Sequence, residues 1–451
     1  MYEDAFSVLK NSGCDFFDIY KEISNTRIVE ARNKKIESVR IGKDSGVGVR
    51  IVNGLSTLFS STYDFSEKSV YDVAKFLADN KPKKNGVFEI QNATERHIES
   101  YNDEHPNLEK IRDIFEIFNS IGYKKDEIKQ ISLTYSDKEK EIEIINEEGR
   151  HVKEKRTYTV LFIEMTAKKG DIIQTSRKPF GVLGGFEFFK DVDFYAIAED
   201  MREKLIELID SPTLKAQSMT VVLSSTAGGT MIHEAVGHGL EADLVYESMS
   251  VYKDKLNQRV ASEKIMVVDD ATRPNMRGSF AFDDEGVDSQ NTLLIENGVL
   301  KSYMFDKMYG KLSGFQSTGN SRRESYRFAP IVRMSNTYIL PGNDDPDDIV
   351  SSVDYGLFVK HMGGGQVNPI TGDFVFEVNE GYIIEKGKIA NMVRGATLVG
   401  NGPKVLEEID MVGSDFGVEV GTCGKGSQGV PVTDGEPTIR IPNIMVGGSA
   451  L

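Results

Sequence analysis

The last of several alternating segments within residues 15–61 is Val47-Gly48-Val49-Arg50-Ile51. The stretch 15–61 determines the architecture of the first part of the chain. Apolar and polar residues alternate there with a period of two, which is typical of half-buried strands. The same alternation occurs earlier in the stretch, at 16–19, 26–29 and 36–39, and polar turns separate the segments. Residues 15–61 therefore predict a meander of successive strands.

Helical patterns lie on both sides of this meander. Residues 3–12 have apolar residues at helical spacing and end at Gly13, and Ser66 caps a second amphipathic segment. After a polar breaker at 81–86, helical patterns around 108–118 and 190–210 enclose further alternating segments. Helices and strands do not alternate strictly, so the pattern predicts the α+β class.

The main boundary is expected at Ser211-Pro212, which follows the longest predicted helix. We expect a mixed helix and meander-sheet region over 1–215, with a sub-boundary near 81–100, and a second domain over 216–451. The last 91 residues hold 18 of the 42 glycines. Such a density is typical of sheets with tight turns, so we expect the second domain to be glycine-rich and sheet-dominated.

Composition excludes several classes of protein. The chain has 451 residues, a net charge of −16 and 39% apolar residues. Clustered cations are needed to bind nucleic acid or anionic lipid, so neither is an expected partner. No stretch approaches the roughly 20 apolar residues that span a membrane, and the acidic start predicts no secretory signal. Only Cys14 and Cys423 are present, which fits a reducing cytoplasm.

The string His233-Glu234-Ala235-Val236-Gly237-His238 contains two of only six histidines in the chain. Neutral imidazoles are good zinc ligands, and a carboxylate beside the metal can take a proton from its water. This HExxxH spacing is one residue longer than the familiar HExxH. Residues five apart differ by about 140° around an α-helix, so two nitrogens cannot reach one ion from a regular helix. We therefore predict an irregular helix over 235–239, carried by the second domain.

Two histidines do not complete a catalytic zinc site, which usually has three protein ligands. Cys423 lies in a loop-like string of small residues, an unusual setting for a core cysteine, and Lys425 nearby would stabilise a thiolate. Residue chemistry favours Cys423 as the third ligand. Glu241, Asp243 and His361 stay open as alternatives.

These motifs resemble those of the TldD/PmbA family, cytoplasmic zinc metallopeptidases once labelled modulators of DNA gyrase. The resemblance is carried by the whole chain and by five strings: residues 233–243, 333–337, 363–368, 422–425 and 446–448. The PmbA (TldE) paralogue lacks the HExxxH string, so its presence here indicates a TldD-type, metal-bearing subunit.

The resemblance implies that His233, His238 and Cys423 bind one Zn²⁺ per TldD-type subunit and that Glu234 is the catalytic base. It also implies that short or unfolded peptides are cleaved in a closed cavity between two subunits, in a heterodimer with a PmbA/TldE-type partner or else in a homodimer. One departure follows the cysteine: Gly426-Ser427 stands where the family has an acidic residue and glycine.

Two other functions compete with the peptidase. A non-catalytic scaffold or modulator subunit would bind peptides or another protein and would not need Glu234. A deformylase-like amidohydrolase uses the same ligand types, but there the cysteine precedes the histidine motif.

The remaining candidates are residues that could hold the substrate and two pairs of acidic residues. Peptides would be held through backbone hydrogen bonds to an exposed strand. Arg333, Asn336 and His361 are substrate-site candidates by motif position only. The acid pairs Asp269-Asp270 and Asp283-Asp284 are expected in solvated loops.

Overall fold

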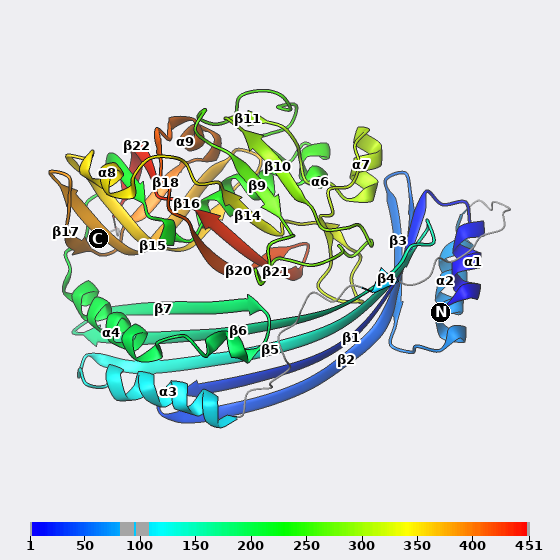
Figure 1. Cartoon of the computed structure of the whole chain (residues 1–451), viewed down its shortest axis with the longest axis horizontal. Helices are drawn as coiled ribbons and strands as arrows, with labels where there is room; N and C mark the ends of the chain where they lie inside the picture. The colour runs from blue at the N-terminus through cyan, green and yellow to red at the C-terminus, as the bar shows by residue number, and fades with distance from the viewer. Residues whose placement is uncertain (1, 82–93, 96–107, 449–451) are drawn as a thin grey trace.

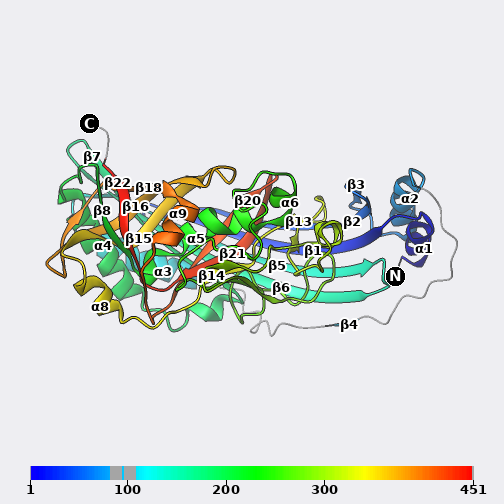
Figure 2. The same cartoon turned by 90° about the horizontal axis from the view of Figure 1, so that it is seen from above.

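The computed structural model describes residues 2–81, 94–95 and 108–448. A long, curved N-terminal sheet lies beneath a block of C-terminal sheets, and a pair of helices sits at one end of the molecule (Figure 1). Seen from above, β22 near the C-terminus lies at the opposite end of the molecule from α1 (Figure 2). Beyond Lys81, the predicted breaker at 81–86 lies outside the described residues, as do His97 and His105.

The N-terminal sheet has the strand order β3-β2-β1-β5-β6-β4, and β7 also pairs with β6. Its strands are β1 (Phe16–Arg32), β2 (Lys35–Asn53), β3 (Ser56–Thr62), β4 (Thr94–Glu95), β5 (Ile128–Asn146), β6 (His151–Lys169) and β7 (Ile172–Leu183). The predicted meander is confirmed, but its short segments are parts of longer strands. They merge because β1 and β2 pair along almost their whole lengths, with one register shift at Glu30/Ala31.

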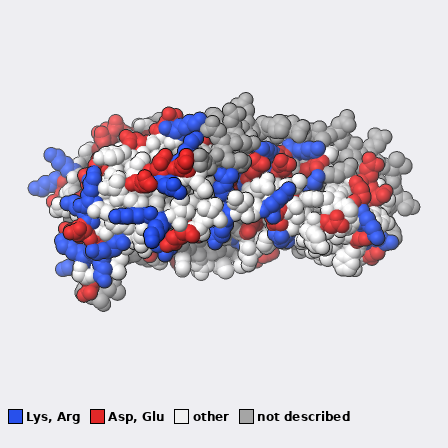
Figure 3. All heavy atoms as spheres, turned by 90° about the horizontal axis from the view of Figure 1, so that it is seen from below, with Lys and Arg blue, Asp and Glu red and all other residues white. Residues whose placement is uncertain are grey.

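Four helices accompany this sheet: α1 (Glu3–Asn11), α2 (Glu67–Ala78), α3 (Leu108–Gly122) and α4 (Phe194–Asp210). α1 and α2 pack against one end of the sheet, whereas α3 and α4 cover one face. Ser66 caps α2 as predicted, because its Oγ accepts a hydrogen bond from the Ser69 amide at 3.2 Å. On the face seen from below, basic and acidic side chains are interleaved (Figure 3).

The C-terminal part contains two larger sheets, ordered β11-β10-β9-β14-β21-β20 and β15-β8-β22-β18-β16-β17, with β19 paired to β22 and a separate β12-β13 pair. Apolar side chains between the two sheets form the main core of the chain. The strands are β8 (Gln217–Leu223), β9 (Val267–Asp270), β10 (Asn291–Glu296), β11 (Val299–Leu300), β12 (Ser321–Arg322), β13 (Ile331–Val332), β14 (Asn336–Ile339), β15 (Tyr355–Val367), β16 (Asp373–Glu385), β17 (Lys388–Val393), β18 (Thr397–Asn401), β19 (Met411–Val412), β20 (Gly417–Lys425), β21 (Gln428–Glu436) and β22 (Ile439–Gly447).

Short helices and turns connect these strands: α5 (Thr230–Ile232), α6 (Ala242–Tyr246), α7 (Lys307–Ser313), α8 (Pro346–Ser351) and α9 (Gly402–Glu408), with single turns at Phe186–Phe189, Ser225–Ala227, His233–Gly237 and His238–Leu240. Helices and strands are mixed throughout the described residues and sheets dominate the C-terminal part, so the predicted α+β class is confirmed. No helix within the described ranges is long and apolar enough to span a membrane.

Buried charges join the N-terminal sheet to the C-terminal part. Arg50 on β2 contacts Asp18 and Glu285, both at 2.6 Å, and Arg323 contacts Asp18 at the same distance. Arg156 on β6 also forms an ion pair with Asp284, at 3.3 Å. The acid pairs Asp269-Asp270 and Asp283-Asp284 are both buried, so the expectation that they lie in solvated loops is wrong. Residues from other segments of the chain supply hydrogen bonds and cations that offset the cost of burying these carboxylates.

Candidate metal centre

The helix that carries His233 and His238 is irregular at the predicted place. After α5, residues His233–Gly237 form a π-turn, in which the His238 amide donates to the His233 carbonyl five residues back. The inserted residue brings the two rings to one side, with centroids 5.1 Å apart and planes nearly perpendicular.

The glycines beside His238 allow neighbouring side chains to pack closely against the turn. Gly237 has ordinary helical dihedral angles, φ −54° and ψ −56°. A Cβ on Gly237 would lie 2.0 Å from the Met334 sulfur, and a Cβ on Gly239 would lie 2.6 Å from the Tyr252 ring. Neighbouring side chains thus hold the turn tightly against the core.

Three donor atoms meet beside this turn. The Sγ of Cys423, on β20, lies 3.3 Å from Nε2 of His233 and 3.4 Å from Nε2 of His238. His233, His238 and Cys423 offer ligand atoms that all lie within 4.8 Å of one another. Two imidazole nitrogens and one sulfur form a donor set that suits zinc.

Each imidazole has a carboxylate behind it. Nδ1 of His233 donates to Oδ1 of Asp434 at 2.7 Å, and Nδ1 of His238 donates to Oε2 of Glu241 at 2.9 Å. Burial lowers the pKa of an imidazole, but Glu241 and Cys423 outweigh it and raise the pKa of His238 to about 10. The pKa of His233 is likewise raised, chiefly by Asp434.

The Cys423 sulfur is predisposed to ionise. Burial raises its pKa, but hydrogen bonds from the two imidazoles outweigh burial and lower the pKa of the thiol to about 5. Lys425 does not contribute as the sequence suggested. Its Nζ is taken up by Glu241 at 3.0 Å and Asp243 at 2.6 Å. Arg333 instead fixes the strand, because its guanidinium donates to the Cys423 carbonyl at 2.5 Å.

The Glu234 side chain lines a cavity beside the three donors. Within the described part of the chain it forms no hydrogen bond or ion pair, so its carboxylate is free to bind a water molecule. Burial raises the pKa of Glu234, which makes it a better proton acceptor than an exposed carboxylate.

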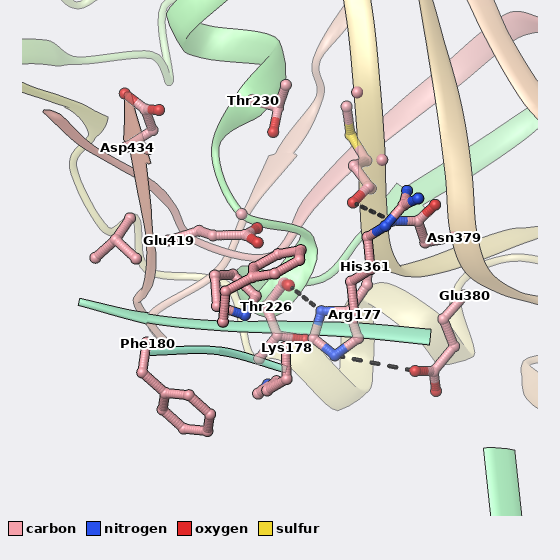
Figure 4. A pocket seen from close by; sticks show the side chains of 18 of the residues that line it. Arg177, Lys178, Phe180, Thr226, Thr230, His361, Asn379, Glu380, Glu419 and Asp434 are labelled. Atoms are coloured by element: carbon pink, nitrogen blue, oxygen red, sulfur yellow. Dashed lines mark hydrogen bonds and ion pairs between the residues drawn. The ribbon is translucent and has the colours of Figure 1, made fainter. Parts of the chain in front are cut away.

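The cavity has a volume of about 970 Å³ and lies between the N-terminal sheet and the C-terminal part. Residues 175–181 of β7 and 417–424 of β20 line it as two unbroken runs. His361 lies on another wall, where Nδ1 donates to the Thr226 carbonyl at 2.7 Å and Nε2 faces Glu380 at 3.9 Å (Figure 4).

The other candidates from the sequence lie elsewhere. Glu241 and Asp243 bind Lys425 rather than joining the donor cluster, and His361 is held by its own partners. Asn336 is buried and donates to Ser279 and the Asp270 carbonyl. Sequence reasoning missed Asp434, because nothing in its local sequence shows that β21 places it behind His233.

Models of one protein family match most of the chain. The family model described as the PmbA/TldA metallopeptidase C-terminal domain matches residues 216–448, the central domain of the same family matches 100–209, and domain 1 matches 17–81.

Relatives extend along nearly the whole chain. A protein of Buchnera aphidicola subsp. Schizaphis graminum, named "Metalloprotease TldD homolog", is 34% identical over 473 aligned positions that cover 99% of this chain and 96% of the relative. A protein of the same name from Haemophilus influenzae is 34% identical and covers 99% and 95% of the two chains. A "Zinc metalloprotease TldD homolog" of Saccharolobus solfataricus is 28% identical and covers 97% of each.

Solved structures share the fold. A Thermotoga maritima protein named as a candidate modulator of a DNA gyrase superposes with a TM-score of 0.81 at 21% identity and covers 99% of both chains. TldE from Thermococcus kodakarensis superposes with a TM-score of 0.73 at 18% identity and covers 96% of this chain and 97% of its own. The names of the relatives confirm the expected enzyme class, a peptide hydrolase. The chain therefore belongs to the PmbA/TldD family of metallopeptidases.

Proposed function

We propose that this chain is a zinc-dependent metallopeptidase in which His233, His238 and Cys423 bind one Zn²⁺ and Glu234 is the general base. The observation that carries the proposal is the convergence of the three donor atoms within 4.8 Å on the wall of a large cavity. The donor set fits zinc: both Nδ1 atoms are engaged by carboxylates, so each Nε2 would offer its lone pair to the ion once the proton that it shares with the sulfur is released.

A bound zinc ion would supply a Lewis acid for the peptide carbonyl and make water more acidic. The protein supplies the proton transfers. Glu234 accepts a proton from the attacking water and passes it to the departing amine. Its position beside the donors and its lack of a competing partner support this role.

We propose short or unfolded peptides as substrates, held mainly through their backbones. Among the described strands, β20 is the last in the order of its sheet and β7 pairs with β6 alone. Each of the two strands therefore has one edge without a strand partner. Both strands line the cavity over consecutive residues, as expected when backbone groups rather than alternate side chains face it. An extended peptide can pair with such an edge, and the pairing depends little on side chains.

We further propose that residues 1–215 and 216–451 form the two units of the enzyme, because β7 from the first and the donor cluster from the second line one cavity. The assembly proposed is a heterodimer with a PmbA/TldE-type chain, or a homodimer, located in the cytoplasm. The fold shared with TldE of Thermococcus kodakarensis supports a partner of similar architecture.

A mixed pool of short peptides, incubated with and without a chelator, tests the activity. Glu234→Gln should keep its zinc and lose roughly 10²- to 10⁴-fold in cleavage rate, since a positioned base contributes that much. If this variant cleaves at the wild-type rate with its metal in place, Glu234 is not the base. If neither protein cleaves the pool under any metal condition, a non-catalytic scaffold is the better assignment.

Metal analysis of Cys423→Ala tests the ligand set. This variant should lose zinc, while Cys14→Ala should retain it, because Cys14 packs against the apolar cluster around α1 and α2, which contains none of the three donors. Full zinc retention in Cys423→Ala would remove Cys423 from the ligands.

A further inference from the structure

Each histidine of the donor cluster donates a hydrogen bond to a carboxylate, and one of these two carboxylates, Glu241, also binds a lysine. We propose that Asp434 and Glu241 are positioning residues, which fix the orientation and the Nδ1-protonated tautomer of His233 and His238 for metal binding. This inference rests on the proposed zinc site and adds to it two residues that do not touch the ion.

Asp434 reaches His233 from β21, the strand that pairs with β20. In this pairing Asp434 lies opposite Glu419, while Cys423 lies opposite Val430. The same two-stranded ladder thus delivers the sulfur ligand and the carboxylate behind His233. Within the described residues, His233 is the side chain that Asp434 binds, and no cation competes for its Oδ1.

The Asp434 contact fixes the ring of His233 chemically. A carboxylate only accepts hydrogen bonds, so Nδ1 must carry a proton and the lone pair of the neutral ring must lie on Nε2, which faces Cys423. The contact is nearly sealed from water, because the side chains of His233 and Asp434 are only 6% and 12% exposed. A buried hydrogen bond of this kind holds the ring in a single orientation.

Glu241 acts on His238 in the same way but shares its charge with a lysine. Its side chain is fully buried, and the same Oε2 that accepts from His238 also accepts from Lys425 at 3.0 Å. Lys425 in turn binds Asp243 and the Val332 carbonyl. The lysine therefore compensates the charge of Glu241, whereas within the described residues no lysine or arginine forms an ion pair with Asp434.

Asp243 provides a matched control. It binds the same lysine as Glu241 but no imidazole. If the hydrogen bond to the ring determines metal retention, Glu241→Gln will weaken zinc binding and Asp243→Asn will not. If only local negative charge matters, the two variants will behave alike.

Zinc affinity is measured by competition with a chromophoric chelator. Loss of a carboxylate behind a ligating histidine commonly lowers metal affinity 10- to 100-fold, so this loss is expected for Asp434→Asn and for Glu241→Gln. Asp243→Asn should stay within about threefold of the wild type. Equal losses in Glu241→Gln and Asp243→Asn would overturn the positioning role of Glu241, and unchanged affinity in Asp434→Asn would overturn that of Asp434.

Proton NMR of the metal-free protein tests the contacts without zinc or activity. Each Nδ1–H that donates to a carboxylate should give a far-downfield signal, and each variant should lose one. Loss of the signal together with unchanged thermal unfolding supports positioning, whereas retention of both signals in both variants overturns it. If the wild type shows both signals but binds no zinc, the proposed metal site fails while the two contacts stand.

Discussion

Replacing Glu436 by glutamine removes a carboxyl group that is completely buried beneath the metal-site helix. One oxygen of Glu436 accepts a hydrogen bond from the Gly229 amide, and the other has no partner. Burial, reinforced by the charges of Glu419 and Asp434, raises the pKa of Glu436 to about 8 from an ordinary value of 4.5.

The sign of the pH effect follows from this shift. The folded protein holds a proton on Glu436 up to about pH 8, whereas the unfolded chain releases it above about pH 4.5. The contribution of this group to the free energy of unfolding is therefore fully present at low pH and is lost as the pH rises through that window. One proton corresponds to about 1.4 kcal/mol per pH unit, or on the order of 4 kcal/mol between pH 5 and pH 8.

Urea unfolding of the wild type and Glu436→Gln at a series of pH values measures the effect. The difference between the two free energies should change by about 1.4 kcal/mol per pH unit between pH 5 and pH 8, in favour of the glutamine variant at higher pH. If the amide packs less well than the carboxyl group, the resulting loss of stability is the same at every pH and does not change this slope. Glu377→Gln, at an exposed position on β16, is the control and should follow the wild-type profile. Parallel profiles for wild type and Glu436→Gln would refute the reasoning.

Urea unfolding also checks four other substitutions. Gly46→Ala would place a Cβ 2.1 Å from the Tyr326 ring and should destabilise by roughly 1–3 kcal/mol, while Gly42→Ala, with nothing within 4 Å, should not; equal effects would contradict this. Ser427→Gly relieves a left-handed residue with φ 60° and should stabilise by about 1 kcal/mol, and no gain would argue against strain there. Arg50→Met leaves the buried Glu285 without its cation and Asp18 with Arg323 alone, and should destabilise by about 3–5 kcal/mol; a neutral result would show that the carboxylates reorganise freely.

Local patterns in the sequence predicted the elements whose signals are local. The cap at Ser66, the helix before Gly13 and the irregular turn beside His238 each depend on residues within a few positions of one another. The departure at Gly426-Ser427 is also understandable now. Both residues have positive φ in the tight turn between β20 and β21, where an acidic residue followed by glycine would fit with less strain.

Contacts between distant segments could not be predicted in this way. Residue chemistry left Cys423 as one of several ligand candidates, and only the fold brings its sulfur to His238 across 185 positions. The same holds for the buried charges. Arg323 and Asp18 are 305 positions apart, so neither residue reveals locally that it will be buried with a counter-ion. Asp434 and Lys425 likewise bind partners far away in the sequence, His233 at 201 positions and Glu241 at 184 positions.

The wide separation between the HExxxH turn and Cys423 has a consequence for biosynthesis. The first two donors leave the ribosome long before the third, which is 190 positions beyond His233, and Asp434 emerges later still. A nascent or truncated chain therefore lacks a complete donor set. Under the proposed function, a chain that stops before Cys423 therefore cannot attack other polypeptides through this site.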